Sequence, residues 1–374
     1  MESSWRTIKS LLRTSVAGAL YISNLHRLLH KGKVTILTYH RVLSRNDLHK
    51  HWVQPGMYVE TGVFEQHMQF LQEHFDVLSF HELLARWQRK DWDDNRRYCV
   101  ITFDDGWLDN YQNAYPILRK HRIPATIFLP TNFVGTNEWF WPEKVSCLIK
   151  EMLSGVDGAQ RYSMGLKVLA QFLNIDEARI RAVSPGEAAR QAFADDIIER
   201  CKNLSPEGIT QFISALASEL QFAFPPERLV MNWEEVADMS GDGIAFGSHS
   251  CSHRILTKLP MDEVKAELVW SQRVLQDRTR NYVPVFCYPN GNNNADIQTL
   301  VQECGYQAAT GVQSGVEGRW PRNLFELRRV SIHNDMTSTV PMYSMRLFGP
   351  IVAWRFRRKT GSGLFRSSTQ QFAV

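Results

Sequence analysis

Short apolar runs that alternate with longer helix-patterned segments constrain this fold more than any other feature of the sequence. The runs are rich in β-branched and aromatic residues, and the segments between them carry apolar residues at helical spacing. Strands that alternate with helices at this spacing are joined by crossovers, so we expect parallel strands. The sequence therefore predicts an α/β sheet or barrel, with strands at residues 34–42, 76–79, 100–103, 123–130, 243–248, 283–288, 306–312 and 327–332.

One long segment interrupts this alternation. From residue 143 to about residue 226, β-branched runs are scarce and helix-forming residues dominate. The alternation resumes afterwards, so we expect a helical insertion within one α/β domain that spans residues 34–335. Residues 1–33 and 336–374 are predicted to flank this domain.

The composition is that of an ordinary globular protein. A chain of 374 residues, 44% hydrophobic and 22% charged, can bury a sizeable core. Its net charge of +4 is too small and too dispersed to predict nucleic-acid binding. The six cysteines lack paired spacing, which favours free thiols in a reducing compartment and argues against a zinc ribbon. We therefore expect a cytoplasmic protein.

Both ends of the chain are basic and amphipathic. The N-terminal apolar run is too short to span a bilayer, and no clean cleavage site of a secretory signal follows it. This segment either docks on the domain as a helix or lies on the inner face of a membrane as a peripheral contact, and the tail from Met342 leaves the same two alternatives. The last dozen residues are predicted to be disordered. The apolar positions at helical spacing in the first segment are Trp5, Ile8, Leu12, Val16 and Leu20.

Two acidic residues stand directly after the strand expected at residues 100–103. Asp104 and Asp105 either begin an ordinary turn or place carboxylates at the carboxyl edge of a parallel sheet, where ligands usually bind. His249 and His253 follow another strand, and their spacing puts both imidazoles on one face. A carboxylate from another strand end can complete a site for one cation. The combination favours a metal site over a turn and two unrelated histidines.

These motifs resemble those of the polysaccharide deacetylases (carbohydrate esterase family 4). Residues 102–106 and 249–253 resemble the first two motifs of that family, in the same order and strand context. Residues 37–42 resemble the entry strand of its exopolysaccharide-type members, and residues 286–291 resemble its third motif. The resemblance covers roughly residues 34–335, interrupted by the insertion, and it implies a distorted or incomplete (β/α) barrel.

The resemblance also implies a metal-dependent N-deacetylase. Asp105, His249 and His253 would bind a divalent metal, expected to be zinc. Asp104 would be the general base that acts on a metal-bound water, and Asn290 would contribute a backbone N–H to the oxyanion. The implied substrate is an N-acetylated amino sugar, in a polysaccharide or in a lipid-linked glycan precursor.

One position departs from the family pattern. Many relatives begin the third motif with an arginine that orients the base, whereas this chain has Cys287, which cannot form an ion pair. Arg328 or Arg329, at the start of a later strand, could replace that arginine. The family's general acid is a histidine near the last strands. His333 is the candidate for it here, with a surface histidine as the alternative.

The side chains that contact the substrate are less sharply defined by the sequence. The residues that end the first strand could line the cleft or pack at the edge of the core. The aromatic ring of Trp141 could stack on a sugar or simply pack. The substrate-binding candidates are Tyr39, His40, Arg41, Trp141, Tyr288 and Arg329.

Two other functions are compatible with the same motifs. The site could cleave another amide, such as a cyclic imide or a non-sugar acetamide, because the metal motifs do not distinguish these substrates. Cys287 could instead mark a catalytically degenerate protein that binds glycan or scaffolds a membrane assembly. The sequence leaves the oligomeric state open.

Overall fold

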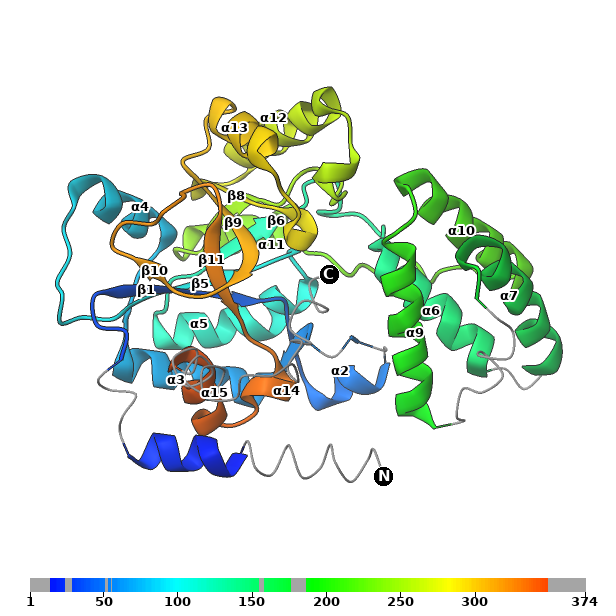
Figure 1. The fold of residues 1–374 in the computed structure, drawn as a ribbon, viewed down its shortest axis with the longest axis horizontal. Coiled ribbons are helices and arrows are strands. Elements are labelled where there is room, and N and C mark those ends of the chain that lie inside the picture. The colour runs from blue at the N-terminus through cyan, green and yellow to red at the C-terminus, as the bar shows by residue number, and fades with distance from the viewer. Residues whose placement is uncertain are drawn as a thin grey trace, which may run out of the picture. The chain divides into compact units, whose positions relative to one another are not determined.

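Seven parallel strands close into a barrel in the computed structural model, which describes residues 14–23, 29–50, 53–54, 56–154, 158–175 and 186–348. The strands follow the order β1–β11–β9–β8–β7–β6–β5, and β1 pairs with β5 to close the ring (Figure 1). Because a complete (β/α) barrel has eight strands, the prediction of an incomplete barrel is confirmed. The bounds are β1 Lys33–Tyr39, β5 Tyr98–Phe103, β6 Thr126–Leu129, β7 Ala245–Ser248, β8 Tyr282–Cys287, β9 Ala308–Ser314 and β11 Leu327–Ser331.

Shorter strands flank the barrel. β4 (Asp76–Val77) pairs in parallel with β5, and β10 (Glu317–Gly318) pairs antiparallel with β1. β2 (Arg41–Leu43) and β3 (Tyr58–Glu60) form a separate parallel pair. The helix α2 (Arg45–Lys50) lies between β2 and β3 in the chain.

Alternate side chains of the strands fill the barrel, as the two-residue period of a strand requires. One buried cluster contains at least one residue from each barrel strand, including Val34 and Ile36 of β1 and Val285 and Cys287 of β8. The helix α4 (Phe80–Arg89) adds its apolar side chains to the same cluster. Cys287 therefore faces the barrel interior at the carboxyl end of β8.

Helices cover the outer face of the barrel (Figure 1). A second buried cluster packs two of them, α12 and α13, against outward-facing side chains such as Phe286 and Tyr288. The longer helices of this unit are α3 (Thr61–His74), α5 (Tyr115–His121), α11 (Trp233–Gly241), α12 (Met261–Arg278), α13 (Ala295–Glu303) and α15 (Val340–Phe348). Shorter helical segments are η2 (Asn110–Ala114), η3 (Leu256–Lys258), η4 (Pro289–Gly291) and α14 (Asn334–Thr337).

A second compact unit consists of residues 45–54 and 136–229, and it occupies the stretch for which we expect a helical insertion. Its longer helices pack around one buried cluster that contains Val145, Ile197 and Phe212. Ser205 caps the last of these helices by accepting a hydrogen bond from the N–H of Gly208 at 3.1 Å. The helices are α6 (Trp141–Ser154), α7 (Gly158–Leu173), α9 (Glu187–Cys201) and α10 (Pro206–Glu219).

The described part of the N-terminal segment packs on the barrel unit. Residues 14–22 form a helix, and the ring of Tyr21 lies 6.3 Å from the ring of Phe70 in α3, measured between centroids. Val16, expected on the docking face, is 49% exposed, whereas Ala17 is fully buried. The buried face of this helix is therefore rotated from the predicted one.

The outer parts of both predicted amphipathic ends lie outside the described residues, namely residues 1–13 and 349–374. The beginning of the C-terminal segment belongs to the barrel unit, because α15 buries Tyr343 and Leu347. Among the helices that the structure describes, none combines the length and the apolar character needed to cross a bilayer.

Candidate metal centre and active site

The carboxyl ends of the barrel strands bring most of the predicted site residues to one rim. The register aligns the end of β1 with the ends of β5 and β11, and β6 with β7. Parallel barrels bind their ligands at this edge. The polar residues that follow β1, β5, β7 and β11 at this rim are His40, Asp104, Asp105, His249 and His333.

Asp105, His249 and His253 converge on one point. The Oδ1 atom of Asp105 lies 3.3 Å from Nε2 of His249 and 3.1 Å from Nε2 of His253. No hydrogen bond satisfies this buried Oδ1 within the described residues. Burial by itself would raise the pKa of the Asp105 carboxyl, but the two imidazoles hold that pKa well below its ordinary value. The carboxyl group is therefore ionised.

The orientation of His249 fits a shared cation. Its Nδ1–H donates to the backbone carbonyl of Cys287 at 2.7 Å, which turns Nε2 toward Asp105. A metal ion between Nε2 and Oδ1 would be bound by both atoms, and the hydrogen bond at Nδ1 would hold the ring in that orientation. Two imidazoles and one carboxylate also form the ligand set of a class of catalytic zinc sites. The three residues therefore fit a divalent metal.

A buried carboxylate holds the loop between the two histidines. The Oε2 atom of Glu267 in α12 accepts hydrogen bonds from the backbone N–H groups of Cys251 at 2.7 Å and Ser252 at 2.8 Å. His253 has a φ of 57°, in the left-handed region that few residues other than glycine adopt. The contacts of Glu267 offset this strain and keep His253 turned toward Asp105.

An indole and an ion pair lie on the other side of Asp105. The Nε1–H of Trp107 donates to Oδ2 of Asp105 at 3.0 Å. The guanidinium carbon of Arg41 lies 4.4 Å from the centre of the Trp107 ring, and Nε of Arg41 donates to Oδ2 of Asp109 at 2.8 Å. The other oxygen of Asp109 accepts from the backbone N–H of Val42 at 2.7 Å. Arg41, a substrate-binding candidate, is thus connected to Asp105 through Trp107.

A bidentate ion pair holds Asp104. Nη1 and Nη2 of Arg329 lie 2.7 Å and 2.8 Å from Oδ1 and Oδ2 of Asp104, and both side chains are buried. Burial would raise the pKa of Asp104, but the charge and hydrogen bonds of Arg329 lower it below the ordinary value. Nη2 of Arg329 also donates to Sγ of Cys287 at 3.3 Å. Arg329 therefore occupies the place of the cation that Cys287 cannot provide.

The two-residue period of β11 separates Arg329 from Arg328. Arg329 shares the inward face with Leu327, which belongs to the cluster inside the barrel. Arg328 points to the other face, where its Nε lies 3.1 Å from Oε1 of Glu317. Of the two candidates for orienting the base, Arg329 is the one that contacts it.

The remaining candidates near the first strand differ in their surroundings. Nε2 of His40 lies 3.9 Å from Oδ2 of Asp104, and burial lowers the pKa of His40, which favours the neutral ring. Tyr39 is fully buried, and its hydroxyl lies 3.1 Å from the hydroxyl of Tyr343. For Tyr39 the structure therefore supports packing at the edge of the core rather than substrate contact.

Tyr288, Asn290 and Trp141 lie in three different settings. Tyr288 is buried against α12 and α13, and its hydroxyl donates to the carbonyl of Phe325 at 2.9 Å, which leaves no surface for a substrate. Asn290 lies in η4 at the carboxyl end of β8, with a φ of 55°. Trp141 begins α6 in the helical unit and is partly buried against that unit's core.

His333 stands between β11 and α14 and is half-buried. The backbone N–H of Ile332, its neighbour, donates to the carbonyl of Thr38 at 2.9 Å, which fixes the end of β11 against the end of β1. His333 therefore lies at the rim, and its role as the general acid stays a prediction.

The sequence motifs do not indicate that Trp107, Asp109 and Glu267 contact the site residues. A signal for Glu267 was present, because its position falls on the buried stripe of α12 with Val264, Leu268 and others, where a charged residue is unexpected. Trp107 and Asp109 follow the first motif directly, but their spacing alone does not reveal their contacts.

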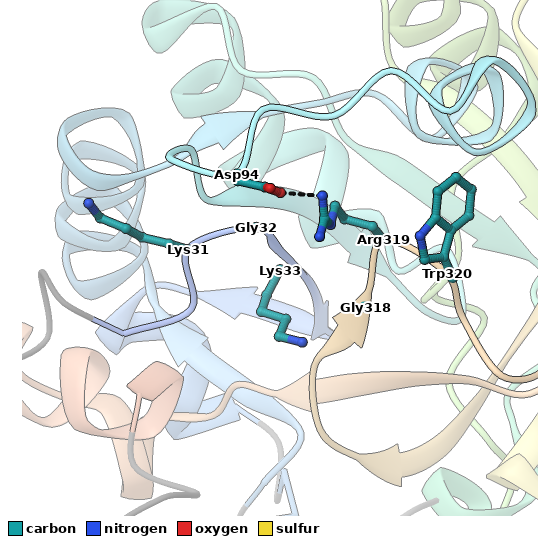
Figure 2. Close-up of a pocket in the computed structure, with 7 residues that line it drawn as sticks. All are labelled: Lys31, Gly32, Lys33, Asp94, Gly318, Arg319 and Trp320. Atoms are coloured by element: carbon teal, nitrogen blue, oxygen red, sulfur yellow. Dashed lines mark ion pairs between the residues drawn. The ribbon is translucent and has the colours of Figure 1, made fainter.

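A pocket of about 370 Å³ lies at the opposite end of β1 (Figure 2). Lys33 begins β1 and His40 follows its last residue, so the pocket is about 20 Å from the rim at the usual rise of a strand. Asp94 forms an ion pair with Arg319 inside it. The pocket is therefore separate from the metal centre; it is lined by Lys31, Gly32, Lys33, Asp94, Gly318, Arg319 and Trp320.

Sequence comparisons identify relatives of this chain. The family model for polysaccharide deacetylase matches residues 92–157 and 209–309. YxkH of Bacillus subtilis (strain 168) is 32% identical over 126 residues, which are 33% of this chain and 41% of that protein. A poly-β-1,6-N-acetyl-D-glucosamine N-deacetylase of Staphylococcus aureus (strain MSSA476) is 34% identical over 107 residues, 26% of this chain and 36% of that protein. The matches span about two fifths of the length of these relatives.

A solved structure shares the barrel. The deacetylase PplD of Streptococcus pyogenes, in complex with acetate, superposes with a TM-score of 0.52 at 17% identity. The superposition covers 85% of this chain and 99% of that chain. At this identity the likeness establishes the fold alone.

Proposed function

Because the chain belongs to the polysaccharide deacetylase family, we propose that it hydrolyses the N-acetyl group of an amino sugar in a glycan. One observation carries the proposal: two adjacent carboxylates have different partners. Asp105 faces two imidazoles, whereas Asp104 is paired with Arg329. One carboxylate can thus hold a cation while the other accepts a proton, which is the division that hydrolysis of an unactivated amide requires.

The ligand set supports a divalent metal held by Asp105, His249 and His253, with zinc as the expected ion. When bound, the metal would polarise the acetamide carbonyl and lower the pKa of water, as Lewis acids do. Cys287 keeps His249 in the correct tautomer, because its carbonyl accepts the Nδ1–H. Glu267 fixes the loop that carries His253.

Asp104 would take the proton from the attacking water. Its depressed pKa keeps it ionised at neutral pH, because Arg329 outweighs the effect of burial. The planar guanidinium fixes both carboxylate oxygens, and each oxygen retains a further lone pair for the proton. His40, beside Asp104, would contact the substrate at this end of the barrel.

His333 would protonate the leaving amine, and the backbone N–H of Asn290 would donate to the oxyanion. Support comes from their positions, since both follow strands whose carboxyl ends form the rim. The presence of Arg329 beside Asp104 also counts against a degenerate protein, because the missing cation was the reason for that alternative. The glycan would be a polysaccharide or a lipid-linked precursor, and another amide remains the alternative substrate.

Two variants test the separate roles of the carboxylate and the imidazole. Metal content and acetate release from an N-acetylglucosamine oligomer are measured on the purified, zinc-loaded chain. We expect Asp104→Asn to keep the metal and to lose acetate release, and His253→Ala to lose the metal. Full turnover by Asp104→Asn at saturating metal would refute its role as the base. A wild-type chain that holds metal but releases no acetate would favour the other amide.

A further inference from the structure

We infer that the hydrogen bond from Trp107 favours metal binding through one oxygen of Asp105 and thereby makes the site more selective for zinc over metals of higher coordination number, such as manganese. The inference rests on the proposed metal centre and goes beyond it, because it assigns the choice of metal to residues that are not ligands. It concerns Trp107 and the pair Arg41–Asp109 that supports its indole.

The two oxygens of Asp105 have different surroundings. Oδ1 lies within 3.3 Å of both imidazole nitrogens and, within the described residues, accepts no hydrogen bond. Oδ2 already accepts the N–H of Trp107 at 3.0 Å. A metal beside His249 and His253 would therefore meet one carboxylate oxygen without a hydrogen bond and one whose electron density the indole N–H already draws on, which makes Oδ2 the weaker ligand atom.

The number of available oxygens affects metals unequally. Zinc is satisfied by three protein ligands and one further position, so one oxygen from Asp105 completes its set. Manganese prefers an octahedral, oxygen-rich environment and gains more from a second carboxylate oxygen. Weakening Oδ2 as a ligand atom therefore disfavours manganese more than zinc.

The indole is itself held in place. It is 1% exposed, and the guanidinium of Arg41 lies over its ring at 4.4 Å. Asp109 orients that guanidinium by a 2.8 Å hydrogen bond and is fixed in turn by the backbone N–H of Val42. Because the indole ring is buried and stacked on Arg41, its N–H cannot turn away from Asp105 without breaking that stacking contact.

The test compares zinc and manganese affinities of the full chain by competition with a chromophoric chelator. Trp107→Phe keeps an aromatic ring for Arg41 but removes the N–H together with part of the indole, so the effect of the lost ring volume needs its own control. Loss of such a supporting hydrogen bond typically weakens metal binding by about 10–100-fold. We expect zinc to lose about this much and manganese to lose little or to gain, so the selectivity for zinc falls about 10-fold or more.

Trp87→Phe is the matched control. Trp87 is also buried, and its Nε1 makes no hydrogen bond within the described residues, so this variant tests the loss of the indole ring without the loss of a hydrogen bond. Arg41→Met is expected to shift the selectivity in the same direction as Trp107→Phe, by a smaller factor. An unchanged ratio in Arg41→Met would remove the supporting role of Arg41.

The outcomes also separate this inference from the proposed function. An equal loss of both metals in Trp107→Phe, or no loss of either, overturns the selectivity. A wild-type chain that binds neither metal overturns the metal centre and the inference together. A wild-type chain that prefers zinc but deacetylates no glycan leaves the inference standing and refutes only the proposed substrate.

Discussion

Arg329→Met removes one partner of a buried ion pair and is the sharpest single test of this site. The side chains of Arg329 and Asp104 are 4% and 6% exposed and share two hydrogen bonds, at 2.7 Å and 2.8 Å. Removing one partner of such a pair typically costs about 3–5 kcal/mol, because a buried charge is left uncompensated. We expect the free energy of unfolding at neutral pH to fall by about this amount.

The same change reverses the balance that sets the pKa of Asp104. In the wild type, Arg329 outweighs burial and holds this pKa below its ordinary value of 3.8, so stability is lost as the pH falls below that value. Without the guanidinium, burial dominates and raises the pKa. The native variant then binds a proton more readily than the unfolded chain, so its stability rises as the pH is lowered from neutral.

We also expect the turnover rate of Arg329→Met to fall. A base that is protonated and no longer oriented should reduce kcat by about 10²–10⁴-fold at neutral pH, and the acidic limb of the kcat/KM profile should move to higher pH. The assays are urea unfolding at several pH values and acetate release over the same range.

Arg328→Met is the control for this experiment. It makes the same substitution one residue away, and it breaks the ion pair with Glu317 on the other face of β11. We expect it to lower stability without moving the pH profile. If Arg329→Met kept wild-type turnover and the wild-type acidic limb, orientation of the base by Arg329 would be refuted.

Two other buried groups give independent tests. Burial lowers the pKa of His67 from 6.5 to about 3, so the unfolded chain binds a proton more readily between these values. The wild type should lose about 1.4 kcal/mol per pH unit as the pH falls through this range. Urea unfolding of the wild type and of His67→Gln measures this loss, and identical pH slopes would contradict it. Glu267→Gln should weaken zinc binding by about 10-fold or more, because it loosens the loop that carries His253. Glu263→Gln, which removes only a partly buried contact with Arg254, is the control in the same chelator competition.

The sequence predicts the fold best where the apolar pattern is strong. The runs expected at residues 243–248 and 283–288 nearly coincide with β7 and β8, because short apolar segments bounded by polar residues have few alternatives. The sequence does not predict β3 and β10, because each is only a few residues long. β3 is defined by its pairing with β2, and β10 by its pairing with β1. Pairings of this kind depend on tertiary contacts that a local pattern does not contain.

The sequence predicts those site residues whose place at the rim follows from their position at the end of a strand. Asp105 and His249 each follow a strand end, and parallel strands place such residues at one edge. The choice between Arg328 and Arg329 is not predictable in this way. Leu327 and Val330 are both apolar and both buried on opposite faces of β11, so the two-residue period does not show which arginine faces inward.

The burial of the Tyr39 hydroxyl could not be predicted from the sequence for a different reason. An aromatic residue at the end of a strand has the same local sequence whether its hydroxyl meets solvent or another side chain. Its partner Tyr343 is 304 positions away in α15. Only the closed barrel and the helix packed on it determine that this hydroxyl is buried.

Asp104 is synthesised long before the arginine that orients it. The two residues are 225 positions apart, on strands that only β1 separates in the closed barrel. At about 5–20 residues per second, the ribosome adds Arg329 roughly 10–45 s after Asp104. By then His249 and His253 have already been added. A nascent chain that has not yet added β11 therefore lacks the partner of Asp104, so the buried ion pair forms only when the last strand closes the barrel.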